Sequence, residues 1–541
     1  MSGRLQQPPR VRFDLLVVGG GIHGLFAALE AAARGWSVGL VERDDFGSGL
    51  SFNHQRTVHG GLRTLQSGRI GKALRQIGTR REWAVMAPHL VRPLPFLLPT
   101  RTDLRRPRVL VGAALRLYDW LGRDRNAGLP EPLHLPASRI ETPDVVVQLF
   151  PGIDQAGLTG GAVWYDYQVR HPDRLNWLVA LAAERAGASL HNHTEATALL
   201  RDGNRVIGVA ARDVLSGEAY ELRAATTLIC AGGGVPVVHA AFGLSGAPAV
   251  VRACNVLVDR PALNLALAAP GASGRMLTAT PWSGRWLIGT FQSDRPSLAS
   301  DHAPTSADVA AMVEDANAAF PSLRLRADDV LLVHSGLAPA LVRRGRADLL
   351  PDHVVIDHSA HGHAGVFTLV GVKFTTARLA ATDALHQMGL AGRSTQSSNA
   401  IALVPELLLH GGSENALPAI QAAFVECNVS LDDEVVEHLV DWYGTEAAEV
   451  LRVSAGAGRL GRLAPDTPML DGEILYAVER SRARRLADAV LRRTRLGAAG
   501  RPGRAALEAA ADVMAARFGW TEGQRADELA RVLARFPVSS R

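Results

Sequence analysis

Lysine is almost absent from this chain of 541 residues. Lys72 and Lys373 are the only lysines among the 58 basic residues, so a position where either cation would serve is nearly always an arginine. Cysteine is also rare, and Cys230, Cys254 and Cys427 lie far apart without metal-ligand spacing. This spacing argues against a disulfide framework and a zinc site, and it fits a reducing compartment.

The sequence also lacks long apolar runs. No stretch reaches the roughly 18 uninterrupted apolar residues that a membrane-spanning helix needs. Residues 1–12 are polar and basic, so we expect a disordered N-terminal segment there and no secretory signal. These absences predict a cytoplasmic protein.

The composition is that of a globular protein, with 47% apolar and 21% charged residues. At about 100–200 residues per domain, the length predicts two to four structural units. The net charge of +5 is spread along the chain, and few aromatic residues alternate with the basic ones. We therefore expect no nucleic-acid partner.

The first ordered elements form a β-α-β pattern. Residues 13–18 (FDLLVV) are a continuous apolar run that ends in glycines, which is typical of a buried parallel strand. Residues 25–34 are alanine-rich with helical spacing, Gly35 ends that helix, and residues 36–41 predict a second strand. The unit spans about thirty residues, as a crossover unit should.

A G-x-G-x-x-G motif connects this first strand to its helix. Gly19 permits the tight turn, Gly21 lets the backbone approach a pyrophosphate, and Gly24 allows close packing of the helix on the strand. Glu42 ends the second strand, where a carboxylate accepts hydrogen bonds from a ribose diol. An acid at that position argues against a 2′-phosphate, so NAD and FAD both remain.

The middle of the chain mixes strand-like and helical patterns, which predicts parallel and antiparallel sheet. The pattern predicts a helix over 175–186, a strand over 189–200, a hairpin from 205–211 and 220–223, and strands over 226–230, 250–258 and 285–289. Residues 393–400 (RSTQSSNA) form a polar linker. After it, helices are predicted over 432–443, 446–452, 472–493 and 504–518.

Several short motifs decide between the two cofactors. They lie at residues 49–65 (GLSFNHQRTVHGGLRTL), 87–93 (APHLVRP), 281–290 (PWSGRWLIGT), 371–376 (GVKFTT), 443–445 (YGT) and 491–494 (LRRT). In this order they resemble the FAD-dependent glycerol-3-phosphate dehydrogenases, in the D-amino-acid-oxidase-like flavoprotein superfamily. The resemblance covers nearly the whole chain from residue 13.

The resemblance implies an α/β fold: a Rossmann-type FAD-binding domain, interleaved with a mixed-sheet substrate-capping domain, and a C-terminal all-helical domain. We place the interleaved FAD-binding and capping domains at 13–395 and the helical domain at 396–541, after the segment 1–12. It further implies FAD as cofactor, a small-molecule substrate, and hydride transfer from a secondary alcohol to flavin N5, with glycerol 3-phosphate giving dihydroxyacetone phosphate. Quinone or oxygen would accept the electrons, and contact with the inner face of the membrane and a homodimer are both left open.

The same resemblance supplies the candidate site residues. As catalytic residues it implies Arg63, Lys373, His59 and Asn255. As cofactor-binding residues we name Gly19, Gly21, Gly24, Glu42, Ser48, Ser51, His59, Gly60, Ala196, Ala231, Gly232, Gly371, Lys373 and Thr375. No metal ligand is implied.

Each catalytic candidate has a physical reason and a plainer alternative. Arg63 can bind a phosphate or carboxylate through two hydrogen bonds, or be a solvated surface cation. Lys373 offers a compact ammonium in an arginine-rich chain, although Lys72 indicates that ordinary helix-surface lysines also occur. A ring nitrogen of His59 can face the flavin, or the ring can be a hydrogen-bonded structural histidine.

The chain departs from the family pattern at the proposed anion site. Thr64 replaces a tyrosine, and Asn255, which cannot act as a base, replaces a histidine. Ala338 and Ile356 stand where two phosphate-binding arginines are expected. Each lost charge-assisted hydrogen bond should cost about 1.5–3 kcal/mol.

Cations nearby are candidates to replace these arginines, namely Arg252, Arg343 and Arg344. Without such replacement, the departures favour a less anionic hydroxy acid, polyol or amine as substrate, or a flavin-binding protein without turnover. Residues 54–56 (HQR) also replace the family's flavin-side serine and lysine residues. His54 and His59 leave open whether the flavin is covalently attached.

One segment is a candidate for membrane contact. Residues 105–108 (RRPR) precede an apolar helical pattern over 109–121 that carries Tyr118 and Trp120. Such a helix can lie in a lipid interface or be buried in the protein, and the sequence does not choose between them.

Overall fold

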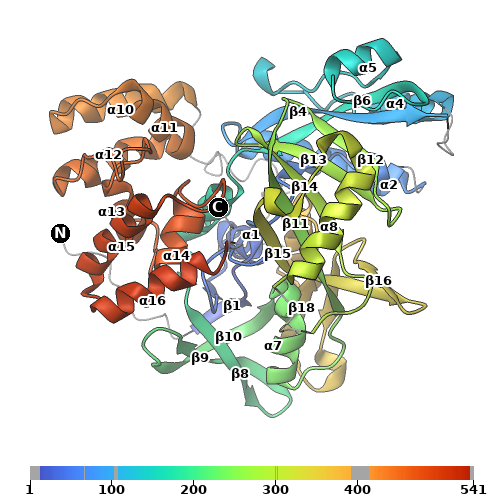
Figure 1. Ribbon diagram of the computed structural model, residues 1–541. Helices are drawn as coiled ribbons and strands as arrows, with labels where there is room; N and C mark the ends of the chain where they lie inside the picture. The colour runs from blue at the N-terminus through green and yellow to red at the C-terminus, as the bar shows by residue number, and fades with distance from the viewer. Residues whose placement is uncertain are drawn as a thin grey trace.

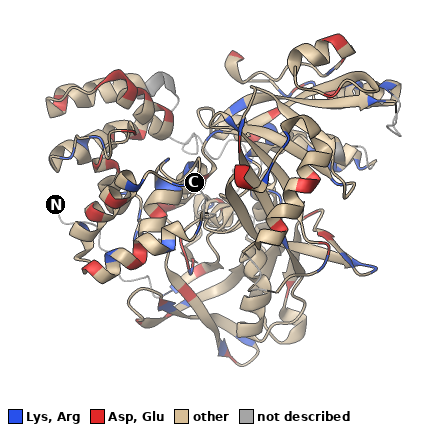
Figure 2. Ribbon diagram, viewed as in Figure 1, with Lys and Arg blue, Asp and Glu red and all other residues tan. Residues whose placement is uncertain are grey.

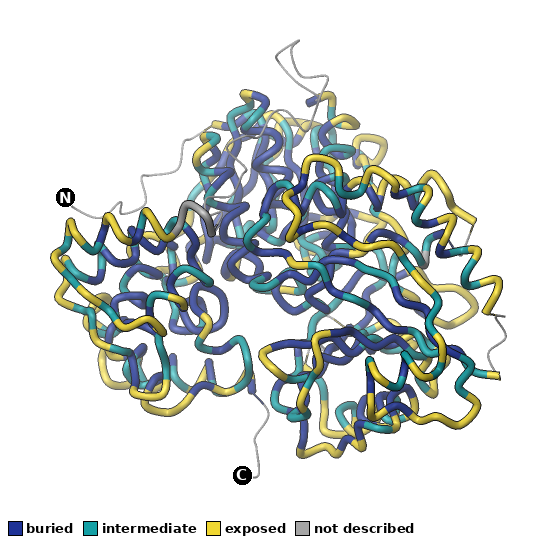
Figure 3. Tube along the Cα trace, turned by 90° about the horizontal axis from the view of Figure 1, so that it is seen from above, coloured by how far each residue is buried: buried dark blue, intermediate teal, exposed yellow. Residues whose placement is uncertain are grey.

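The computed structural model describes residues 12–65, 68–102, 108–298, 300, 303–390 and 413–536. Residues 1–11 and the predicted linker at 393–400 lie outside this part of the chain, so the expected N-terminal disorder is not tested. The described residues form two sheets with their covering helices and a group of C-terminal helices, drawn orange to red in Figure 1. Buried residues lie in the interior of these units, and exposed residues follow their outer helices and loops (Figure 3).

The first sheet is mostly parallel. Its path runs β17 (Val354–Asp357), β18 (Val366–Val370), β10 (Ala219–Ile229), β1 (Arg12–Val18), β2 (Val38–Val41) and β7 (Ser189–His191), with β9 (Arg205–Asp213) paired to β10 and β8 (Thr194–Asp202) paired to β9. The strands from β18 to β7 are parallel, and β17 is an antiparallel edge. The predicted β-α-β unit is confirmed by β1, helix α1 (Ile22–Ala33) and β2.

Both faces of this sheet are covered, which explains the unbroken apolar run of β1. Leu15 and Val17 pack against α1, α6 (Pro172–Arg185) and α9 (Ala377–Gln387). Leu16 and Val18 pack on the opposite face with α7 (Val235–Phe242) and the β8–β9 hairpin. A strand buried on both faces reads as continuous rather than alternating hydrophobicity.

The second sheet is mixed and forms the other layer of the interleaved domain. Its strands are β16 (Arg346–Leu349), β15 (Val330–Arg343), β11 (Ala249–Pro261), β14 (Arg285–Gln292), β13 (Met276–Trp282), β12 (Ala266–Pro270), β4 (Val91–Arg101), β6 (Leu158–Val169) and β3 (Thr57–Val58), with β5 (Arg139–Glu141) beside β6. One face packs on α8 (Ser306–Ala319) and α5 (Pro143–Leu149). The predicted mixture of parallel and antiparallel strands is confirmed.

The regular elements of the C-terminal unit are all helices in its described residues, as predicted. Its helices are α10 (Ser413–Cys427), α11 (Asp433–Tyr443), α12 (Ala447–Gly456), α13 (Gly472–Glu479), α14 (Leu486–Asp488), the π-helical turn η7 (Ala489–Arg493), α15 (Arg504–Phe518) and α16 (Glu522–Leu533). It packs on the second sheet through a shared apolar cluster that includes Trp282, Leu287 and Leu332. The helices therefore lie against the cofactor domain rather than apart from it (Figure 1).

Three element predictions were wrong in detail. The strand expected over 189–200 is divided into β7 and β8 by a turn at Asn192 and His193, where His193 has φ 53°. The strands expected at 220–223 and 226–230 are one strand, β10. The helix expected over 472–493 is interrupted between α13 and α14, where the chain turns to bring Arg492 and Arg493 toward the cofactor domain.

Helix α4 (Arg108–Leu121) answers the question left open for residues 109–121. Only Leu115 and Tyr118 are buried, whereas Val109 is 83% and Trp120 61% exposed. The buried-helix alternative was therefore wrong, and α4 is a surface helix with an exposed apolar stripe. Within the described residues, no helix has the length and apolar composition needed to cross a membrane.

Candidate active site

The predicted cofactor loops lie together at one edge of the first sheet. Gly19 follows β1, Glu42 follows β2, Ala231 follows β10 and Gly371 follows β18, and these four strands are parallel neighbours. Loops at the carboxyl ends of parallel strands form the usual ligand crevice of such folds. Ala196 lies farther away along β8, opposite Ala211.

The glycine motif has the close packing that its residues predict. Gly19 has φ +113°, and a Cβ there would overlap the Cys230 carbonyl. A Cβ on Gly24 would overlap the Gly19 carbonyl, so the helix can approach the strand only with glycine here. Gly21 caps α1 without a side-chain hydrogen bond, and Ser51 Oγ accepts from the Ile22 N–H at 2.9 Å. The helix N-terminus thus remains suited to a phosphate group.

Glu42 lies beside this turn with both oxygens engaged by backbone donors. Oε2 accepts from the Gly20 N–H at 2.7 Å and Oε1 from the Asp44 N–H at 2.9 Å. Burial raises the pKa of Glu42, although both backbone hydrogen bonds lower it. Each carboxylate oxygen retains a second lone pair, so a ribose diol can still donate to it.

An ion-pair network holds the turn after Glu42. Asp45 receives hydrogen bonds from Arg492 and Arg493 of the C-terminal unit, and Arg492 also binds Asp488, which lies 2.8 Å from His193 Nε2. The ligand atoms of Asp45, His193 and Asp488 lie within 4.8 Å of one another. The two guanidinium groups already supply positive charge to this cluster.

Ser48 and Gly232 take structural places near the same edge. The Ser48 N–H donates to the Asp45 carbonyl at 3.0 Å, within the turn that the network holds. Gly232 has φ +52° and begins the short helical turn that follows Ala231. Neither position shows a contact that would test its predicted role in cofactor binding.

The His59 loop is anchored by residues that the sequence analysis did not single out. Asp166 on β6 accepts from the Gly60 N–H at 2.7 Å and from Arg80 at 2.6 Å, and its Oδ2 lies 3.5 Å from His59 Nδ1. His59 Nε2 lies 2.7 Å from Thr57 Oγ1, and half of the His59 side chain is exposed. The buried anchor therefore orients an accessible imidazole.

A second loop meets the first through Thr375. Its hydroxyl accepts from the His59 N–H at 3.1 Å, and its carbonyl accepts from the Trp83 indole at 2.9 Å. Phe374 stacks between Trp83 and His54, with ring centroids 5.1 and 4.3 Å away. Lys373, partly buried in the same loop, adds its charge to the surroundings of Asp352.

Asn255 and Arg63 were both predicted to be catalytic, and of these two only Asn255 has a described side chain. Asn255 is buried, its amide donates to the Asn53 carbonyl at 3.1 Å, and its oxygen accepts from Thr290 at 3.0 Å. It therefore fastens the strand to the flavin-side segment. Arg63 lies in helix α2 (Leu62–Leu65), but its side chain lies outside the described part of the structure.

The expected replacement arginines do not gather in this region. Arg252 is paired with Asp308 on α8, and Arg343 and Arg344 are exposed at the tip of the β15–β16 hairpin. Ile356 lies in the edge strand β17 opposite Thr368. Ala338 is buried on β15 opposite Val251.

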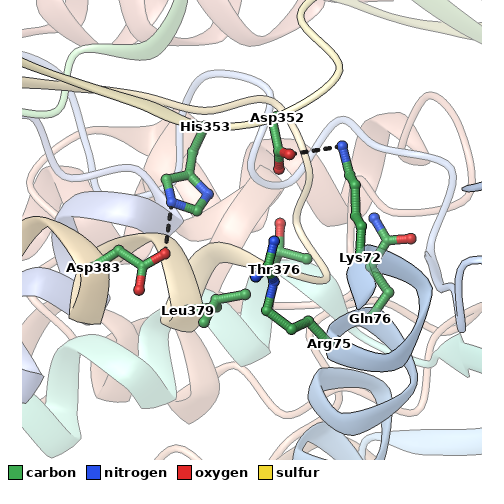
Figure 4. Close-up of a pocket in the computed structure, with 8 residues that line it drawn as sticks. All are labelled: Lys72, Arg75, Gln76, Asp352, His353, Thr376, Leu379 and Asp383. Carbon is green, nitrogen blue, oxygen red and sulfur yellow. Dashed lines mark hydrogen bonds and ion pairs between the residues drawn. The ribbon is translucent and has the colours of Figure 1, made fainter. Parts of the chain in front are cut away.

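A polar pocket of about 190 Å³ lies next to the Thr375 loop (Figure 4). It is lined by Lys72, Arg75, Gln76, Asp352, His353, Thr376, Leu379 and Asp383. The first three come from α3 (Ile70–Met86), and the last three precede or belong to α9. The pocket is thus bounded by two helices and the segment between β16 and β17.

Comparison with known proteins decides the family. Residues 14–383 match the family model described as FAD dependent oxidoreductase, and 405–525 match the C-terminal domain of alpha-glycerophosphate oxidase. Glycerol-3-phosphate dehydrogenase 2 of Mycobacterium tuberculosis is 32% identical over 97% of this chain and 88% of its own length. The chain belongs to the FAD-dependent glycerol-3-phosphate dehydrogenase family.

Other members of the glycerol-3-phosphate dehydrogenase family agree in extent and fold. The glycerol-3-phosphate dehydrogenase of Synechocystis is 29% identical over 95% of this chain and 94% of its own length. The crystal structure of the Bacillus halodurans glycerol-3-phosphate dehydrogenase complexed with FAD superposes with a TM-score of 0.73, covering 97% of this chain and 94% of that one at 23% identity. The predicted fold class, enzyme class and FAD cofactor are confirmed.

The residues present in this family member fit FAD. Gly19 and Gly24 let α1 begin directly against β1, Gly21 adds no side chain at the helix N-terminus, and Glu42 lies beside this turn. On the flavin-side segment, His54 Nε2 and Gln55 Oε1 are buried without a hydrogen-bond partner among the described residues. Buried polar atoms of this kind normally have a partner, and the polar edge of a bound cofactor can supply one.

Proposed function

We propose that this enzyme oxidises glycerol 3-phosphate to dihydroxyacetone phosphate. The observation that carries the proposal is the junction of the two flavin-side loops, where the His59 N–H donates to Thr375 and Asp166 holds the His59 ring. Relatives named glycerol-3-phosphate dehydrogenases along nearly the whole chain support this substrate. FAD, once bound, supplies a hydride acceptor at its N5 position.

In this proposal, His59 takes the proton of the substrate hydroxyl. With Nδ1 directed at Asp166, Nε2 is the basic atom, and it lies against the Thr57 hydroxyl. The substrate O–H would pass its proton to Nε2, directly or through Thr57, as a bound FAD accepted the carbinol hydride. The C–O bond becomes a carbonyl, and Asp166 stabilises the resulting imidazolium.

The cofactor contacts are proposals that follow from position. Gly19, Gly21 and Gly24 receive the pyrophosphate on the N-terminus of α1, and Glu42 binds the ribose. His59, Gly60, Gly371, Lys373 and Thr375 surround the flavin ring. Ser48, Ser51, Ala196, Ala231 and Gly232 complete the contacts. Quinone or oxygen would then accept the electrons. We also propose that the enzyme is a homodimer.

A second candidate keeps the chemistry and changes the substrate. Ala338 is buried where the family resemblance expects an arginine, and Arg252 is already paired with Asp308. This favours a less anionic hydroxy acid, polyol or amine. A flavin-binding protein without turnover is the remaining alternative, because Asn255 cannot act as a base.

An anaerobic flavin-reduction screen distinguishes these functions. The FAD-loaded enzyme is mixed with glycerol 3-phosphate, glycerol, 2-hydroxy acids and amines, and the visible flavin absorbance is followed. Glycerol 3-phosphate is expected to bleach the flavin fastest. Faster bleaching by an uncharged polyol, a hydroxy acid or an amine would favour the second candidate, and bleaching by none of them would favour a protein without turnover.

We also propose that α4 contacts the membrane surface. Val109, Leu117 and Trp120 are exposed along one helical stripe, with Arg116 and Arg123 beside them. The Arg123 guanidinium lies 5.7 Å from the Trp120 ring. Apolar side chains edged by arginines suit an interface with anionic lipid headgroups. Charged residues elsewhere are scattered over the ribbon in both signs (Figure 2).

A further inference from the structure

Both lysines of this chain act on one carboxylate. Lys72 Nζ lies 2.8 Å from Asp352 Oδ2. Burial alone would raise the pKa of Asp352, but the hydrogen bond and charge of Lys72, with the charges of His353 and Lys373, hold it below its usual value. The ion pair with Lys72 is the direct contact that holds this carboxylate.

Lys72 is not the ordinary surface lysine that its helical position indicated. Its side chain is only 10% exposed, and its ammonium also donates to the Pro351 carbonyl at 2.8 Å. A solvated surface lysine does not bury its stem and fix its ammonium against a backbone carbonyl. Lys72 therefore reaches from α3 into the pocket, toward the segment between β16 and β17 (Figure 4).

One cation of this pocket, Arg75, has no carboxylate partner among the described residues. Asp383 lies 2.9 Å from His353 Nε2, so it is already engaged. Arg75, which also lines the pocket, is exposed and forms no ion pair within the described part of the chain. Asp352 is thus paired with Lys72, and Arg75 lines the same pocket without an ion pair. Such a pocket suits an anionic ligand, which would pair with Arg75 and compete with Asp352 for Lys72.

The pocket adjoins the flavin-side loops. Thr376 lines it, and the preceding residue, Thr375, accepts the His59 N–H. Gln76 lines it as well and leaves no room for a side chain at Gly61. A ligand in the pocket is therefore separated from the His59 loop by single residues on two different segments.

The pocket also lies near Ala338, which stands where the family resemblance expects an arginine. The Leu350 N–H donates to the Pro339 carbonyl at 3.0 Å, which puts the segment that Lys72 contacts beside the residue following Ala338. Lys72 thus places an ammonium from α3 near Ala338, where the guanidinium expected from the family resemblance is absent. The sequence could not show this, since residues 72 and 351 are brought together only by the fold.

We propose that Lys72 and Arg75 bind the phosphate group of a phosphate-monoester substrate, and that Asp352 occupies this position until the phosphate displaces it. Lys72 is thereby a specificity-determining residue that keeps the anionic substrate acceptable despite Ala338. A phosphate dianion satisfies the cations better than one carboxylate, because it offers three acceptor oxygens and more charge. The inference rests on the proposed function and names the side chains behind its substrate class.

Binding to the oxidised, FAD-loaded full chain tests the proposal apart from turnover. Isothermal titration calorimetry measures the Kd of glycerol 3-phosphate and, as a second probe, of inorganic phosphate. Lys72→Ala is expected to weaken both by about tenfold or more, since a charge-assisted hydrogen bond is lost. Arg75→Ala, at an exposed position, should weaken both as well and serves if Lys72→Ala does not fold.

Two further variants sharpen the test: one is a control for the loss of a cation, and the other removes the competing carboxylate. Arg81→Ala removes a cation from the same helix whose side chain binds the Ala127 carbonyl instead, and it should leave both Kd values unchanged. Asp352→Asn should tighten phosphate binding several-fold, because the competing carboxylate is gone. Equal Kd values in wild type and in the Lys72→Ala and Arg75→Ala variants, or no phosphate binding to wild type, would overturn the proposal.

Failure of the proposed function would be recognised separately. If glycerol 3-phosphate binds through Lys72 but does not bleach the flavin, the phosphate site stands and the proposed reaction is wrong. If it bleaches the flavin and Lys72→Ala leaves its Kd unchanged, the reaction stands and the phosphate site is wrong.

Discussion

Arg493 donates two parallel hydrogen bonds to Asp45 across the boundary between the C-terminal helices and the cofactor domain. Nη1 lies 2.8 Å from Oδ2 and Nη2 lies 2.7 Å from Oδ1, and both side chains are buried. Asp45 belongs to the turn that follows Glu42, and Gly47 in that turn donates to the Gly20 carbonyl at 2.9 Å. The C-terminal unit therefore supports the cofactor loop.

Removing this ion pair should weaken the packing of the C-terminal helices on the cofactor domain, and it should weaken FAD binding. Arg493→Met leaves Asp45 buried with one cation fewer, which should cost on the order of 3–5 kcal/mol. We expect weaker FAD retention, measured by flavin fluorescence after dilution, and faster proteolysis at the domain boundary. Arg517→Met, at an exposed arginine 3.5 Å from Glu479, is the matched control and should change neither. Normal FAD retention in Arg493→Met would contradict this account.

His59→Gln should remove the base and leave binding intact. General-base catalysis contributes about 100- to 10,000-fold, so flavin reduction at saturating substrate should slow by that order. The Kd of substrate should change little, because the phosphate contacts lie elsewhere. Asp166→Asn should slow the same step less and shift its pH profile, since it alters the group that orients the imidazole. Unchanged reduction rates in both variants would exclude His59 as the base.

Acid should destabilise the protein through histidines that are neutral in the fold. Burial, together with Arg56 and His59, lowers the pKa of His54 from 6.5 to about 3, and burial with Arg56 also lowers that of His334. Between these values the unfolded chain binds more protons than the folded one, so stability is full above about pH 6.5 and is lost as pH falls toward 3. Each such histidine contributes about 1.4 kcal/mol per pH unit in that window.

The pH effect is checked by thermal unfolding midpoints in matched buffers. The midpoint should fall steadily as pH decreases from 6.5, and His54→Gln should reduce the slope because one titrating group is removed. A midpoint independent of pH across this window would show that these histidines are not held neutral.

Membrane contact through α4 makes a prediction about two exposed side chains. Replacing Val109 and Trp120 by serine should weaken flotation with anionic vesicles without changing the folded protein, since both are exposed. High salt should weaken flotation of the wild type as well, because Arg116 and Arg123 contribute through charge. A Val237→Ser variant, at an exposed apolar residue on α7, is the control. Equal flotation of all three proteins would refute the contact.

Local pattern was enough to predict the parts of the fold whose signals lie within short segments. The apolar run of β1, the glycines and the alanine-rich α1 carry their periodicity in the sequence, and the structure confirms each. The strand expected over 189–200 failed for a nonlocal reason. His193 turns the chain with φ 53° to reach Asp488, a partner almost three hundred residues away, and nothing near His193 indicates it.

The candidate site divides in the same way. Its glycine turn, Glu42 and the Thr375 loop have motifs and follow strands of the first sheet, so the edge that they share was predictable. Asp166 and Arg80, which hold the His59 loop, have no motif, and only the pairing of β6 with its neighbours brings them there. Lys72 reads as a helix-surface residue because its partners, Pro351 and Asp352, are remote in sequence.

The most direct test of the central claim is anaerobic stopped-flow mixing of the FAD-loaded enzyme with glycerol 3-phosphate. The account predicts a single-turnover loss of the oxidised flavin absorbance that saturates with substrate and yields one dihydroxyacetone phosphate per flavin. An oxidised flavin spectrum that persists at millimolar glycerol 3-phosphate would contradict it.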